Sequence, residues 1–165
     1  MFDTTPLSNA VRDASLDIRT LLFDNGGSKE YGELLHWAIF RPSDDCLDGV
    51  KLILRKGAPI NLLKYQNDKS SWSWRKPFNL GTPLHTAARI GKVDIVEELL
   101  SNGADPFIRD SCGELALETA LDENHGLGGA NAAIGLRHFN KCCAQAVALH
   151  PLQSKNPFYR RPRSP

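Results

Sequence analysis

Apolar residues recur at helical spacing in two short runs within TPLHTAARIGKVDIVEELLSNGA, which begins at Thr82. One run precedes Gly91 and the other follows it, so the pattern predicts two amphipathic helices with a break at this glycine. The apolar positions are Leu84, Ala87 and Ala88 in the first helix and Val93, Val96, Leu99 and Leu100 in the second. One such helix pair cannot cover its own apolar face, so the pattern also predicts stacking of several pairs.

The ends of these two predicted helices carry residues that favour helix termini. Thr82 is a good N-cap, and Pro83 then occupies the first helical position, where the missing N–H costs nothing. Gly103 suits the left-handed residue that often ends a helix. The segment therefore predicts a helix–turn–helix unit with its own start and stop signals.

The same unit recurs along the chain. The segment that begins at Thr5 aligns with the segment at Thr82 without a gap, and a weaker copy around Glu33 carries His36 in register with His85. A further copy begins at Leu115, about 33 residues after Thr82, which is the period of one known class of helical repeat. The residues that carry this repeat signature are Thr5, Pro6, Leu7, His36, Thr82, Pro83, Leu84, His85, Gly91 and Gly103.

These strings resemble the ankyrin-repeat family, and the most specific are Thr-Pro-Leu-His-x-Ala-Ala at Thr82 and Asn-Gly-Ala-Asp at Asn102. The resemblance covers about three-quarters of the chain and implies an all-α solenoid of four stacked helix–turn–helix units. Their expected ranges are 5–30, 33–61, 81–110 and 113–123, the last continuing further. In the family, residues such as His36 and His85 are structural and tie a turn to a helix through backbone and threonine oxygens.

The interval 62–80 is predicted to be an inserted loop between the second and third units, and loops of this length are usually functional or disordered. The family usually meets its partners with the inter-unit turns and with exposed positions of each first helix. Residues of the types that anchor interfaces gather at these places. The candidate partner-binding residues are Trp37, Phe40, Trp72, Trp74, Arg75 and Arg89. Three alternatives stay open for the loop: Trp72 or Trp74 packs back on Trp37 and Phe40, the aromatic side chains form an exposed patch, or the loop is disordered.

Beyond Glu123 the repeat pattern weakens. The interval 124–150 is predicted to hold a flexible glycine-rich loop and a C-terminal capping helix, and 151–165 a basic, disordered tail. The charge after Glu123 is +6, which leaves −5 on the rest because the whole chain carries +1. This asymmetry allows a rival hypothesis, a nucleus-associated regulator whose tail contacts nucleic acid or acidic partners. A second rival is a truncated or degenerate ankyrin copy with little function of its own.

Residue combinations that carry chemistry are weak in this sequence. No secretory signal or apolar run of membrane-spanning length is present, so the four cysteines are interpreted as reduced thiols in the cytoplasm or nucleus. His138, Cys142, Cys143 and His150 have ligand chemistry but lack the paired spacing of a zinc site. We therefore expect no catalytic residue, metal, cofactor, small-molecule substrate or membrane contact. The predicted function is a monomeric, non-catalytic protein–protein interaction module, an adaptor or regulator that binds another protein rather than nucleic acid.

Overall fold

The computed structural model describes residues 5–28, 33–42 and 44–123. These residues form eight α-helices and no strand, apart from an isolated bridge between Arg109 and Leu115. The predicted all-α fold class is therefore confirmed. The helices are α1 (Pro6–Asp13), α2 (Leu16–Asp24), α3 (Leu34–Phe40), α4 (Cys46–Arg55), α5 (Lys69–Arg75), α6 (Pro83–Arg89), α7 (Val93–Ser101) and α8 (Ala116–Glu123). None of them combines the length and the apolar character that a bilayer crossing demands.

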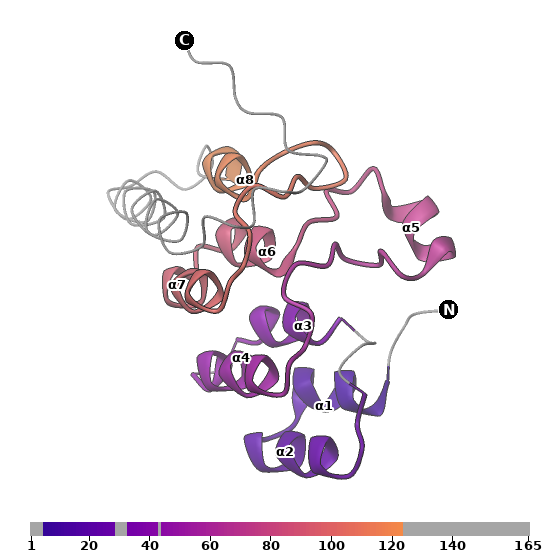
Figure 1. Cartoon of the computed structure of the whole chain (residues 1–165), viewed down its shortest axis with the longest axis vertical. Coiled ribbons are helices and arrows are strands. Elements are labelled where there is room, and N and C mark those ends of the chain that lie inside the picture. The colour runs from indigo at the N-terminus through magenta and orange to yellow at the C-terminus, as the bar shows by residue number, and fades with distance from the viewer. Residues whose placement is uncertain (1–4, 29–32, 43, 124–165) are drawn as a thin grey trace.

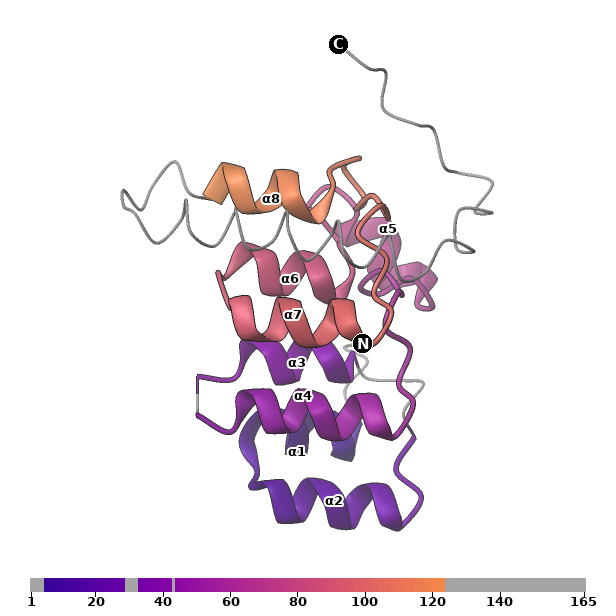
Figure 2. The same cartoon turned by 60° about the vertical axis from the view of Figure 1, so that its left-hand side comes forward.

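Seven of these helices lie in two rows that run along the long axis of the molecule (Figure 1). Helices α1, α3, α6 and α8 follow one another in an inner row, and α2, α4 and α7 form an outer row (Figure 2). The helices form three pairs, α1–α2, α3–α4 and α6–α7. The first pair packs on the second, the second packs on the third, and α8 packs on α6. The core fills the space between the rows with side chains that water does not reach, among them Val11, Ala38, Ile39, Val50, Ile53, Ala87, Ile95 and Leu99.

Local sequence sets the helix ends. Thr5 begins α1 with a capping box, in which Ser8 N–H donates to Thr5 Oγ1 at 3.1 Å and Thr5 N–H donates to Ser8 Oγ at 2.7 Å. In α6 the N-cap is Thr82, whose N–H donates to His85 Nδ1 at 3.2 Å, and Pro83 lies at the first position of the helix. Gly91 separates α6 from α7 with a φ of +71°, a conformation that glycine adopts without strain.

The interval 62–80, which we call the α5 arm, contains a short helix where the sequence predicts only a loop. Asp68 caps that helix, because its carboxylate accepts the N–H groups of Ser70 and Ser71 at 3.0 and 3.3 Å. Both ends of the arm are tied to neighbouring turns. Lys64 N–H donates to Gly81 O at 3.0 Å, and the hydroxyl of Ser111 donates to Lys76 O at 2.6 Å. The arm itself projects sideways from the inner row (Figure 1).

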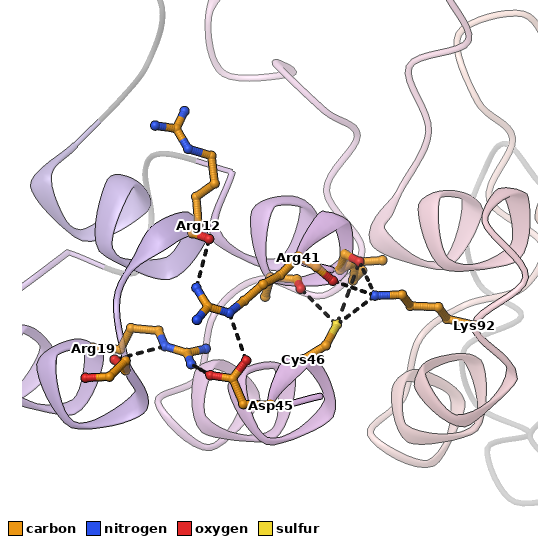
Figure 3. A network of polar contacts seen from close by, with 9 residues as sticks. Arg12, Arg19, Arg41, Asp45, Cys46 and Lys92 are labelled. Carbon is orange, nitrogen blue, oxygen red and sulfur yellow. Dashed lines mark hydrogen bonds and ion pairs between the residues drawn. The ribbon is translucent and has the colours of Figure 1, made fainter. Parts of the chain in front are cut away.

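A polar network joins the first three helix pairs (Figure 3). Asp45 accepts hydrogen bonds from Arg19 and Arg41, and Arg41 Nη1 donates to Arg12 O at 2.8 Å. The Arg19 side chain is fully buried, and its Nη1 has no hydrogen-bond partner among the residues that the structure describes. Lys92 Nζ donates to Ile39 O in the last turn of α3 at 3.0 Å and to O of Arg41, the C-cap residue of that helix, at 2.8 Å. It thereby supplies donors to carbonyl groups that a helix end leaves unpaired.

The first and third pairs match in sequence but differ in burial. Ile18 aligns with Ile95, yet Ile18 is 48% exposed whereas Ile95 is fully buried. The reason is position in the stack, since α7 packs against α4 and no described helix precedes α2 on that side. The predicted loop and capping helix of 124–150 and the predicted tail of 151–165 lie outside the described residues.

Candidate protein-binding surface

Basic and aromatic side chains alternate where the α5 arm meets the inner row of helices. The Nζ atom of Lys64 lies 5.6 Å from the ring centroid of Trp37, 5.2 Å from that of Phe40 and 5.3 Å from that of Tyr65. These distances are within the range of cation–π attraction. Two arginines extend the arrangement, because Arg75 Cζ lies 5.2 Å from the Tyr65 ring and Arg12 Cζ lies 5.6 Å from the Trp37 ring. We call Arg12, Trp37, Phe40, Lys64, Tyr65 and Arg75 the basic aromatic cluster.

Glu33 fixes the start of the arm against α3. This residue occupies the N-cap position of α3 with a φ of +54°, and its Oε1 accepts the N–H of Tyr65 at 2.7 Å. Tyr65 has a φ of +61°, and its side chain is buried. Two residues in left-handed conformations therefore meet through one hydrogen bond and place Lys64 above the rings. No local sequence pattern reveals the contact of Glu33 with Tyr65 or the position of Lys64, because these contacts link positions about 30 residues apart.

The positive charges around the cluster lie close enough to affect one another. Burial lowers the pKa of Lys64, Glu33 partly offsets that effect, and the nearby Arg89 and Arg75 lower the pKa further. Burial is also the main reason that the pKa of His36 falls to about 3, and the charges of Lys64 and Arg89 add to it. Lys64, Arg75 and Arg89, which come from the arm and from α6, thus contribute to one region of positive potential.

The two aromatic side chains farthest along the arm face water. Trp74 is 82% exposed and Phe78 is 73% exposed, while Trp72 is half-buried. Trp74 does not pack on Trp37 and Phe40, which was one of the alternatives that the sequence left open. Lys64 takes the place beside those two rings instead. The surface therefore combines a partly buried basic aromatic cluster with exposed rings on α5 and on the turn that follows it.

Comparison with known families now decides the class of protein. Residues 79–111, which include α6 and α7, match the model of the family described as Ankyrin repeat. The stacked helix pairs described above agree with this match. The chain contains an ankyrin repeat. An ankyrin repeat indicates a module that interacts with other proteins. The surface formed by the inner helices is therefore a candidate site for such an interaction.

Related ankyrin-type segments occur in much longer proteins. XBAT34 of Arabidopsis thaliana, named as an E3 ubiquitin-protein ligase, is 39% identical over 83 residues, which are 50% of this chain and 19% of that protein. Palmitoyltransferase AKR1 of Kluyveromyces lactis is 38% identical over 93 residues, 56% of this chain and 10% of the relative. The 2-5A-dependent ribonuclease of Mus musculus is 42% identical over 64 residues, 39% of this chain and 7% of the relative. The chain thus spans less than a fifth of the length of each.

The histidines of the repeat signature, His36 and His85, hold neighbouring helix pairs together. His85 Nδ1 lies 2.9 Å from Thr82 Oγ1, and its Nε2 lies 3.0 Å from Glu114 O in the turn before α8. His36 Nδ1 lies 2.8 Å from Oγ1 of Thr86, a residue of α6 in the next pair. Thr86 is buried, and its contact with His36 joins the second helix pair to the third.

Proposed function

We propose that the chain is a non-catalytic adaptor or regulator that binds another protein with the α5 arm and the adjoining ends of the inner helices. The exposed Trp74 carries this proposal, with Phe78 in support. Exposed apolar side chains that gather in one patch mark interaction sites, and tryptophan is among the residues that most often anchor an interface. Here two such side chains extend from a repeat stack whose family indicates protein interaction.

The arrangement favours binding with little loss of conformational freedom. The inner helices are held by the buried core. The α5 arm is closed at its base by the hydrogen bond from Lys64 N–H to Gly81 O, and the Ser111 hydroxyl, which donates to Lys76 O, ties it to the turn before α8. Since the platform is already ordered, a partner would not have to supply the free energy to order it. The partner-binding residues that we propose are Trp37, Phe40, Trp72, Trp74, Arg75 and Arg89.

Two observations support a non-catalytic role. His36 is buried and its pKa is about 3, so it is neutral and shielded from any substrate near neutral pH. His85 is buried, and both of its ring nitrogens contact groups of the protein itself. Relatives named as a ligase, a transferase and a ribonuclease are far longer than this chain, and we assign none of their activities to it.

The test is affinity capture of partners from a cell lysate, quantified by mass spectrometry, with the full chain and with Trp74→Ala. We expect partner recovery to fall roughly tenfold or more, as at an interface hot spot. The melting temperature should stay the same, because the side chain is 82% exposed. Leu21→Ala is the matched control, since Leu21 is 61% exposed on α2, away from the α5 arm (Figure 1). Equal recovery by both variants and the parent chain would refute the proposal.

A further inference from the structure

The proposed function does not specify the chemistry of the partner. The charges around the α5 arm indicate which kind of peptide the surface can bind. Building on that function, we propose that the α5 arm and helices α1, α3 and α6 form a docking surface for an acidic peptide segment of the partner that also carries aromatic or long aliphatic side chains.

The first argument is an excess of positive charge contributed by separate elements. Arg12 comes from α1, Lys64 and Arg75 from the arm, and Arg89 from α6. Lys64 and Arg75 both lie over the Tyr65 ring, and Lys64 and Arg12 both lie over the Trp37 ring. Arg89 belongs to α6, which packs on α3, and the charges of Arg75 and Arg89 also lower the pKa of Lys64. A segment that carries carboxylates would reduce the repulsion among these cations.

The second argument is that the acidic groups nearby are already engaged. Glu33 accepts the N–H of Tyr65 at 2.7 Å, and its other oxygen lies 3.6 Å from His36 Nε2. Asp13 pairs with Arg12 at 2.8 Å. Asp68 accepts the N–H groups at the start of α5. These three carboxylates of the described residues are thus committed to the fold of the arm or to a neighbouring side chain, so they oppose an acidic segment less than free carboxylates would.

The acidic residues of the neighbouring helices support the same assignment. Helices α3 and α6, which contribute to the surface, carry no acidic residue, whereas α7 carries Asp94, Glu97 and Glu98 and α8 carries Glu118, Asp122 and Glu123. This distribution directs an acidic segment toward α3, α6 and the arm, where the basic aromatic cluster lies.

The arrangement of the rings favours a peptide over a nucleic acid. Single-stranded nucleic acids bind through bases stacked on exposed aromatic faces. Lys64 and Arg12 lie over the Trp37 ring, and Lys64 and Arg75 lie over the Tyr65 ring, so cations already occupy these faces. The exposed side chains of Trp74 and Phe78 offer edges and faces to apolar side chains beside the cations. A peptide that carries carboxylates next to an aromatic or aliphatic residue matches these exposed rings and the cations beside them.

The experiment selects binders from a phage-displayed library of random 12-residue peptides on the immobilised full chain. We expect the selected peptides to be enriched in Asp and Glu next to Trp, Tyr, Phe or Leu. The best of them, made synthetically with a fluorescent label, should bind Arg75→Glu/Arg89→Glu at least about tenfold more weakly than the parent chain. Arg55→Glu, a reversal at an exposed position of α4 in the outer row, should bind like the parent. Circular dichroism melting of all variants establishes that they fold.

Selected peptides without acidic enrichment, or equal affinity of the labelled peptide for the double variant and the parent, would overturn the inference. A competition experiment adds a third test, in which unlabelled peptide or a twenty-nucleotide oligothymidine displaces the labelled peptide. Displacement by the oligothymidine at a lower concentration than by the unlabelled peptide would also overturn the inference. That result would assign the surface to nucleic acid. The proposed function is judged separately. If Trp74→Ala loses lysate partners while the library gives no acidic enrichment, protein binding stands and the acidic chemistry is wrong.

Discussion

Acidification should destabilise the fold through His36 well before most carboxylates titrate. This histidine is buried, lies 2.8 Å from Thr86 Oγ1 and has a pKa of about 3, against about 6.5 for a histidine in an unfolded chain. Because the folded state has the lower pKa, the unfolded state binds the proton more readily as the pH falls. The stabilising contribution of the neutral ring is therefore complete above pH 6.5 and is lost progressively between pH 6.5 and about 3.

The size of the effect follows from the two pKa values. Each pH unit between them costs about 1.4 kcal/mol, so lowering the pH from neutral to about 5 should remove about 2 kcal/mol of stability through His36 alone. The pKa of His85 is also lowered, mainly by burial, so this residue contributes a loss of the same sign. A loss of this size is a large fraction of the stability of a small domain.

Urea unfolding, followed by circular dichroism at several pH values between about 7.5 and 5, measures the effect. In His36→Asn the shorter amide still reaches toward Thr86 but has no proton to gain, so its free energy of unfolding should depend less steeply on pH. The variant should start less stable at neutral pH and approach the parent as the pH falls. If both proteins lose stability in parallel, His36 is not the group that titrates, and the argument from its burial is wrong.

Two further substitutions test the polar network between the helix pairs. Lys92→Met keeps the aliphatic stem but removes the donors to Ile39 O and Arg41 O, and urea unfolding should show a loss of about 2 kcal/mol; a loss below about 0.5 kcal/mol would contradict that role. Asp45→Ala leaves the buried Arg19 without its carboxylate and should cost about 3 kcal/mol or more. Adding Arg19→Met to Asp45→Ala should recover part of that loss, and a strictly additive double-mutant cycle would show that the two side chains are not coupled.

The sequence predicted the repeat fold well because its signals are local. Thr82, Pro83 and Gly91 act within a few residues of themselves, and their positions set the start of α6 and the break before α7. The apolar spacing predicted most of the buried face of α7, although Val93 is only half-buried and Ile95 is fully buried. Local signals of this kind can be read from one chain without knowledge of distant contacts.

The α5 helix shows a signal that was present but weak. Three serines and two tryptophans in and around Lys69–Arg75 give a low helix propensity, and the segment is too short to form a helix by itself. Asp68, followed by Ser71 three residues later, is the local clue, since the Asp68 carboxylate accepts both the N–H and the hydroxyl of Ser71 at the start of the helix.

The candidate surface depends on contacts that no local pattern reveals. The aromatic and basic residues could be chosen by type, but the bond between Glu33 and Tyr65 and the position of Lys64 over three rings arise only when the chain returns to α3. The burial of Arg19 is a similar case. At the position where α7 has Val96, an arginine faces the next pair and is tolerated because Asp45 lies opposite and Gly49 leaves space for the guanidinium group.

Hydrogen–deuterium exchange of the full chain, with and without the peptide selected from the library, tests the central claim most directly because it maps where a partner contacts the stack. We expect bound peptide to slow amide exchange in α3, in α6 and in the α5 arm, residues 62–80. The exchange rates of α2, α4 and α7 should stay the same. Protection concentrated on the outer helices, or peptide binding without protection of the arm, would contradict the claim.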